Sequence, residues 1–313
     1  MSSHRREIVW IHGLHGFFRG PEDFRALAGA LEAAFIQPPS DPDSLNWSLN
    51  RDVDLDPSVR LRFVSWDLRS WLSSPDCKSL DDLVNRFLLV FHESHPSKSP
   101  RSSRSEHLER HIALGEGLGA RVLMQILNKE SHALDDAHAK KGKRRRSTDP
   151  LWDRVILLSG HPGFSNEEER EKRRALEERW AERILREPLE KVREDWFKQP
   201  PFSTSPRLLE QLNSEARDWR GQMSPQRLAE VAQTFLLGRQ IDMRPGLAEW
   251  RALEESLRVL WVAGERDRKF VSLLHELQDL QVMGEFWMCP DSGHAVFLDA
   301  PADLAEKIRS FLI

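Results

Sequence analysis

An imidazole and a carboxylate in the last fifty residues are the groups in this sequence best suited to acid–base chemistry. Asp267 follows the apolar run 259–263, and His294 follows the run 286–288 within the sequence Asp-Ser-Gly-His. A carboxylate that orients an imidazole makes a general base, and such a pair commonly activates a hydroxyl nucleophile. The sequence therefore predicts that Asp267 and His294 act together, beside a further segment that carries the reacting group.

A glycine-rich segment in the middle of the chain, Gly115-Glu116-Gly117-Leu118-Gly119, is the candidate for that further segment. It separates an apolar run from a helical pattern, so it predicts a sharp turn between a strand and a helix. One site of this kind is the nucleophile elbow, G-x-Ser-x-G, in which Gly117 stands at the serine position. The other is the dinucleotide fingerprint G-x-G-x-x-G/A, which Gly115, Gly117 and Ala120 satisfy.

The order of the motifs along the chain favours the elbow. An early glycine loop, His12-Gly13-Leu14, follows the apolar run 7–11, and the elbow, Asp267 and His294 come after it in that order. This order is typical of α/β-hydrolases, whereas a dinucleotide fingerprint usually lies in the first strand–helix unit. We therefore expect an α/β-hydrolase fold.

The elements around these motifs predict a mainly parallel, doubly wound sheet with an inserted helical cap. Apolar runs alternate with helical patterns over residues 1–163 and 246–313, which we assign to the core. The charged, wholly helical pattern of residues 164–245 interrupts that alternation and is assigned to the cap. Residues 135–149 carry a run of lysines and arginines and are expected to form a basic flexible loop within the core.

The composition narrows the class of protein and of partner. The 313 residues are 31% charged with a formal net charge of −4, which disfavours nucleic acid as a partner. No apolar stretch is long enough for a membrane span and no signal peptide is recognisable, so we expect a cytoplasmic protein. Cys77 and Cys289 lack metal-type spacing, so we expect neither a metal site nor a disulfide. The sequence leaves the oligomeric state open.

Beyond these core motifs, the chain resembles the 2-succinyl-6-hydroxy-2,4-cyclohexadiene-1-carboxylate synthases of menaquinone biosynthesis. The likeness covers most of residues 7–35, 109–127 and 153–313. It is most specific in four segments: Gly160-His161-Pro162-Gly163, Glu187-Pro188-Leu189, Asp195-Trp196-Phe197-Lys198-Gln199-Pro200 and Gly264-Glu265-Arg266-Asp267-Arg268-Lys269-Phe270.

The resemblance implies a lyase of the hydrolase superfamily that eliminates pyruvate from an ester-like succinyl-cyclohexene carboxylate, without a cofactor. His294 and Asp267 would be catalytic, and the backbone N–H groups of Leu14 and Leu118 would form the oxyanion hole. The substrate, a small molecule with carboxylates, would be bound by four side chains of the family pattern: Arg121, Arg173, Trp196 and Arg220.

Two positions depart from the family pattern. Gly117 replaces the serine, and Glu116 replaces a tyrosine commonly found before it. Without the hydroxyl, the base would be either His294 or Glu116. Two other hypotheses remain open: a catalytically impaired homologue that acts as a binding protein, and, more remotely, a dinucleotide-dependent oxidoreductase.

Overall fold

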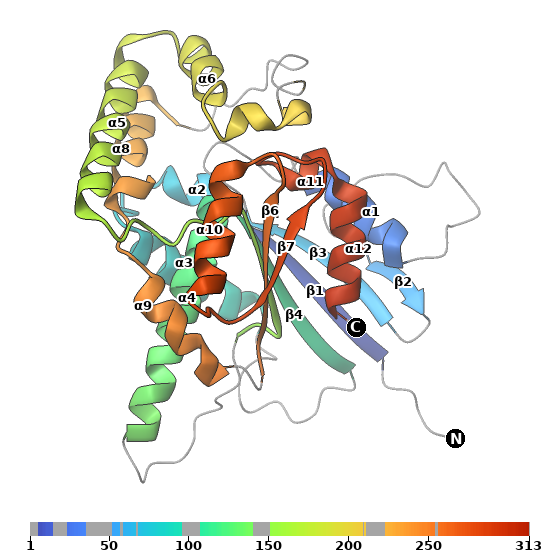
Figure 1. Ribbon diagram of the computed structural model, residues 1–313. Helices are drawn as coiled ribbons and strands as arrows, with labels where there is room; N and C mark the ends of the chain where they lie inside the picture. Colours follow the sequence, from blue (N-terminus) through green and yellow to red (C-terminus); the bar gives the residue numbers. More distant parts are fainter. Residues whose placement is uncertain are drawn as a thin grey trace, which may run out of the picture.

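The computed structural model describes residues 6–14, 24–35, 52–56, 59–66, 68–95, 107–139, 151–208, 210, 223–253 and 256–312. Its centre is a seven-stranded sheet in the order β2-β3-β1-β4-β5-β6-β7 (Figure 1). The strands are β1 (Arg6–Leu14), β2 (Asp52–Asp56), β3 (Val59–Trp66), β4 (His107–Glu116), β5 (Arg154–Leu158), β6 (Arg258–Gly264) and β7 (Glu285–Cys289). Only β2 of these strands pairs antiparallel to its neighbour. The sheet is therefore mainly parallel, as predicted.

Helices cover both faces of the sheet, because alternate apolar residues of its central strands point to opposite sides. Ile156 and Leu260 belong to the core on the side of α1, α11 and α12, whereas Val155 and Val259 belong to the core beneath α3, α4 and α10. The core helices are α1 (Arg25–Phe35), α2 (Leu68–Leu72), α3 (Leu80–Ser94), α4 (Leu118–Ala139), α9 (Arg244–Glu249), α10 (Arg268–Asp279), α11 (Val296–Asp299) and α12 (Pro301–Leu312), with the 3₁₀ helix η7 (Trp250–Leu253) after α9.

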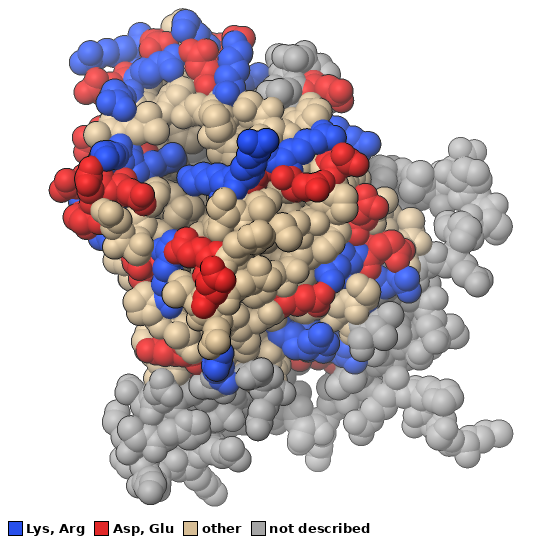
Figure 2. Space-filling view, viewed as in Figure 1, with Lys and Arg blue, Asp and Glu red and all other residues tan. Residues whose placement is uncertain are grey.

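The inserted segment forms helices above the carboxyl ends of the strands (Figure 1). These are α5 (Glu167–Arg186), α6 (Leu189–Phe197), η4 (Phe202–Thr204), α8 (Pro225–Thr234) and η6 (Leu237–Arg239). Figure 2 shows basic and acidic side chains interspersed over this part of the surface. Many of them form i,i+4 pairs along a helix, such as Lys172 with Glu168 and Lys198 with Glu194. The charged composition of the segment therefore stabilises and solvates its helices.

Arg227 connects these helices to the core through hydrogen bonds. From α8, the Arg227 guanidinium donates to the backbone carbonyls of Leu72, Ser74 and Cys77 at 2.7–2.8 Å. Guanidinium suits this position because its planar fork presents several donors at once. The contact fixes α8 against the loop that follows α2.

The boundaries of the basic segment differ from the expectation. Helix α4 continues to Ala139, so residues 135–139 are helical and do not belong to a loop. Residues 140–149 lie outside the described part of the chain. Among the described helices, none combines the length and apolar character that crossing a bilayer requires.

Candidate active site

The turn between β4 and α4 has the backbone conformation of an elbow. Gly117 lies at this turn with φ +55°, in the left-handed region that favours glycine, and its N–H donates to the carbonyl of Leu158 at 3.3 Å. A Cβ at Gly119 would lie 2.2 Å from the carbonyl oxygen of Leu14, so only glycine lets α4 approach β1 this closely. The glycines thus hold the elbow although its hydroxyl is absent.

The predicted acid–base pair is assembled. Nδ1 of His294 lies 2.7 Å from Oδ2 of Asp267, and both side chains are buried. A carboxylate only accepts, so Nδ1 carries the ring hydrogen and Nε2 is left as the basic nitrogen. Oδ1 of Asp267 also accepts from the N–H of Phe270, which caps α10 and fixes the carboxylate. The pair is therefore oriented as a general base requires.

The helical segment above the strands, which we propose as a cap, holds the loop that carries His294. The backbone N–H of His294 donates to Oγ1 of Thr204 at 3.1 Å, and the backbone N–H of Ala295 donates to Oγ of Ser205 at 2.7 Å. The ring of Phe202 meets the imidazole edge-on at 5.1 Å, and Phe270 lies 4.9 Å away. The position of the imidazole thus depends on residues 202–205 of the cap.

A cavity of about 130 Å3 lies between the elbow, the His294 loop and the cap. Its polar lining includes His294, the buried carboxylate of Glu116 and the buried hydroxyl of Ser159. Its remaining lining residues are Gly117, Leu118, Arg121, His161, Arg173, Trp196, Phe197, Phe202, Leu236, Leu237 and Phe270. Both candidate bases therefore border the same space as Gly117.

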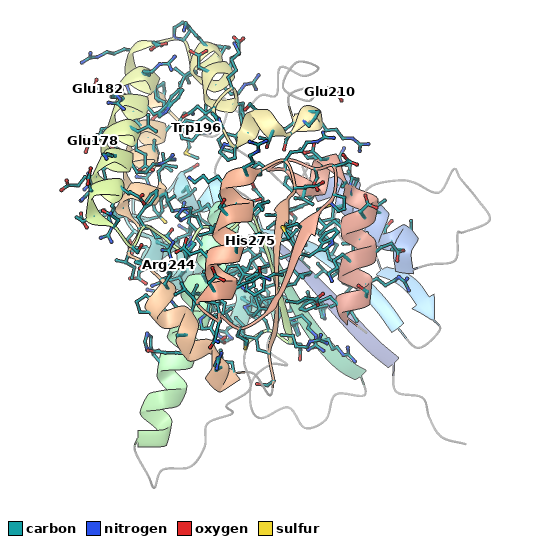
Figure 3. All side chains as sticks on the ribbon, in the orientation of Figure 1. Glu178, Glu182, Trp196, Glu210, Arg244 and His275 are labelled. Atoms are coloured by element: carbon teal, nitrogen blue, oxygen red, sulfur yellow. The ribbon has the colours of Figure 1, made fainter. Side chains whose placement is uncertain are left out.

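Three of the four predicted substrate-binding residues line this cavity. Nε of Arg173 donates to Glu177 at 2.6 Å, so the cation is held in place by a buried carboxylate. Arg121 is buried, and this burial lowers its pKa to about 10. Trp196 of α6 is buried against Trp180 of α5, whereas Glu178 and Glu182 lie on the outer side of α5 (Figure 3). Arg220 lies outside the described residues.

The two predicted oxyanion-hole residues come from elements that flank the elbow. Leu14 is the last residue of β1 and pairs with Gly115 of β4, and Leu118 is the first residue of α4. Both side chains are buried. Their backbone N–H groups remain the proposed donors to a developing negative charge.

Two polar residues that the sequence analysis did not select also line the cavity. Ser159 follows β5 with φ +46°, an unusual conformation for serine, and its Oγ donates to the carbonyl of His294 at 2.9 Å. His161 belongs to one of the segments that resemble the synthases, and its Nδ1 accepts the N–H of Gly163 at 3.1 Å. The sequence feature that could have identified both residues is their position just after the apolar strand β5. The carboxyl ends of parallel strands form the edge of the sheet at which binding sites usually lie.

Three buried histidines, His12, His95 and His111, meet beside the sheet and near the aromatic rings of α3, away from the cavity. Nδ1 of His12 accepts from the indole N–H of Trp66 at 3.1 Å, so Nε2 of His12 carries its hydrogen and donates to Nδ1 of His111 at 3.2 Å. A metal ligated by that Nε2 would have to displace the hydrogen. The hydrogen bonds thus fit neutral, stacked rings better than a metal centre.

Comparisons with known proteins agree with this architecture. A protein from Salmonella heidelberg (strain SL476) named 2-succinyl-6-hydroxy-2,4-cyclohexadiene-1-carboxylate synthase is 32% identical over 158 residues, which are 50% of this chain. The protein of the same name from Salmonella schwarzengrund (strain CVM19633) matches equally. The chain thus spans about 58% of the length of these relatives.

Solved structures match over nearly the whole chain. MenH from S. aureus has a TM-score of 0.66 at 18% identity, covering 98% of this chain and 93% of that one. Rv0554 from Mycobacterium tuberculosis has a TM-score of 0.60 at 12% identity, covering 98% and 90%. Residues 8–307 match the family model described as the alpha/beta hydrolase family. Together with the sheet order, the elbow and the Asp267–His294 pair, this match shows that the chain belongs to the alpha/beta hydrolase family.

Proposed function

We propose that this chain catalyses a menaquinone-pathway elimination, in which a succinyl-cyclohexene carboxylate loses pyruvate, with His294 as the base. The observation that carries the proposal is the intact Asp267–His294 pair beside a cavity that Gly117 and two cap residues, Arg173 and Trp196, also line. The relatives named as the synthase support the pathway assignment.

An elimination needs a base but no covalent intermediate. Nε2 of His294 would take a ring proton, and the electrons of that C–H bond would form the new C=C bond. The C–O bond to the leaving group would break, and the leaving group would take a proton to become pyruvate. Asp267 would stabilise the imidazolium, and Arg173 would bind a substrate carboxylate. Without the serine hydroxyl, the proton would pass to the imidazole directly or through a water molecule.

The assay measures pyruvate released from the substrate by the purified chain, with detection through a coupled reduction of pyruvate. We expect release above the uncatalysed rate, lost in His294→Ala and largely kept in the exposed control His275→Ala. If Glu116→Gln abolished release while His294→Ala did not, Glu116 would replace His294 as the base.

Because Gly117 replaces the serine, a second function is also supported: a protein that still binds the substrate in the pocket but no longer catalyses its conversion. Loss of one member of a cooperative catalytic unit typically lowers the rate by several powers of ten. Substrate binding in calorimetry without pyruvate release, unaffected by His294→Ala, would favour this second function over the first.

A further inference from the structure

A second, larger cavity of about 460 Å3 lies on the other side of Arg121, outside the candidate active site. It is bordered by the start of α3, the end of α8 and the segment around η6: Lys78, Ser79, Leu80, Arg121, Gln233, Thr234, Phe235, Leu236, Arg239 and Gln240. Only Arg121 and Leu236 of these residues also line the smaller cavity. The volume is within the usual range for small-molecule sites.

The charged lining of this cavity has a single sign. Lys78, Arg121 and Arg239 line it, and none of its described lining residues is acidic. Of the acids nearest in sequence, Asp82 accepts from the backbone N–H of Lys78 and donates its own N–H to Oγ of Ser79, and Asp81 pairs with Lys129. Arg239 pairs at 3.4 Å with Glu178, and both side chains are about half exposed. The side chains that line the cavity therefore carry a net positive charge, and the acids that partly compensate it, Asp82, Glu177 and Glu178, lie outside the lining.

Arg121 is the strongest indication of an anionic ligand. Its guanidinium is buried, yet it donates to neutral acceptors, Oε1 of Gln240 and the carbonyl oxygen of Phe235. Within the part of the chain that the structure describes, no carboxylate oxygen lies within 4.0 Å of its nitrogens. Burial lowers the pKa of Arg121, and the buried carboxylate of Glu177, beyond that distance, raises it in part. The guanidinium itself donates to neutral acceptors, so an anion in the adjoining cavity would stabilise it further. Guanidinium also matches carboxylate and phosphate oxygens in geometry.

We infer that this cavity binds a small anion with at least two acidic groups, either carboxylates or phosphate oxygens. One acidic group would face Arg121 at the inner end, and the other would lie between Lys78 and Arg239 at the outer end. Gln233 and Thr234 would offer neutral hydrogen bonds. The inference does not depend on the proposed elimination.

Calorimetric titration of the full chain with inorganic phosphate and, separately, with succinate tests the inference, with acetate as the monoanion control. We expect saturable binding of phosphate or succinate that is stronger than that of acetate. The preferred anion of the two identifies the acidic group. The double variant Lys78→Gln/Arg239→Gln removes two exposed charges, so it should fold normally and bind that anion roughly tenfold more weakly.

The matched control is Lys172→Gln/Arg251→Gln, which removes the same net charge from exposed positions outside the cavity lining. It should bind the anion as the unmodified chain does. Equal weakening in both double variants, or binding that does not saturate, would overturn the inference. Pyruvate release is measured in parallel, so a failure of the proposed elimination leaves the binding result interpretable.

Discussion

Oδ2 of Asp267 lies 2.7 Å from Nδ1 of His294, although 26 residues separate them in the chain. The carboxylate is fixed at the start of α10, and the imidazole near the end of the loop between β7 and α11. Because β6 and β7 are parallel neighbours, the residues that follow them meet at one edge of the sheet. The pairing that the sequence predicts thus depends on the register of two strands.

Asp267→Asn should lower pyruvate release roughly 10³-fold, because an amide can donate to Nδ1 and favour the wrong tautomer of His294. Asparagine is also a good N-cap, so α10 and the stability of the fold should be kept. The readout is kcat with the melting temperature measured alongside. Asp303→Asn, at an exposed position on α12, is the control. Unchanged kcat in Asp267→Asn would show that the imidazole does not act as the base.

Gly117→Ser should add hydrolytic activity toward a simple aryl ester, because the hydroxyl would return next to an oriented imidazole. It should also lower stability by about 1–3 kcal/mol, since φ at this position is +55° and glycine alone adopts it without strain. Gly117→Ala is the matched control, with the same strain and no hydroxyl. If the serine variant were no more active than the alanine variant, the pocket would lack a working triad geometry.

His161 should make the fold less stable in mild acid. Burial, with Lys269 and Arg244 nearby, lowers its pKa well below the ordinary 6.5, and protonation would turn the Nδ1 acceptor of the Gly163 N–H into a donor. The unfolded chain takes up a proton below pH 6.5 while the folded chain does not, so stability is present above that pH and falls below it.

Below pH 6.5, protonation at His161 should lower the free energy of unfolding by about 1.4 kcal/mol for each unit that the pH falls, until the pKa of His161 in the folded chain is reached. Chemical denaturation between pH 7 and pH 5 measures it, and His161→Gln should reduce the slope. His275→Gln, at an exposed position (Figure 3), should leave the slope as it is. The same slope in His161→Gln as in the unmodified chain would assign the acid sensitivity to other groups.

Arg227→Gln should destabilise the attachment of the cap, because the guanidinium donates to three core carbonyls and glutamine cannot reach all of them. We expect a loss of about 2–4 kcal/mol in the free energy of unfolding. Arg309→Gln, which loses only a surface pair with Glu306, should change stability by well under 1 kcal/mol. Equal effects of the two substitutions would show that the Arg227 contact does not hold the layers together.

Both cysteines should resist alkylation in the folded protein. Cys77 and Cys289 are buried, and burial raises the pKa of each thiol, that of Cys289 to about 11, so little thiolate forms at neutral pH. Mass spectrometry after brief treatment with iodoacetamide measures the modification, with the denatured chain as the reactive control. Rapid labelling of the folded chain would indicate local opening around these residues.

The sequence predicted the central elements well, because buried parallel strands are apolar on both faces and the elbow glycines leave a distinct pattern. It missed β2, whose sequence Asp-Val-Asp-Leu-Asp is poor in strand-forming residues and which pairs at the edge of the sheet with β3. It also missed the contacts of Thr204 and Ser205 with the His294 loop, in which the two partners of each hydrogen bond are 90 residues apart in the chain. Such contacts leave no periodic signal, since they depend on how the cap folds back over the strands.

The hydroxyls of Thr204 and Ser205 connect the segment that covers the pocket to the loop that carries His294. Any cap motion wide enough to lift residues 202–205 away from the strands breaks both hydrogen bonds to the loop and removes the Phe202 ring from the imidazole. An open cap would thus leave the loop and the imidazole without these three contacts, and a closed one would restore them. In the proposed elimination, enclosing the ligand and completing the contacts that position the base would therefore be one event.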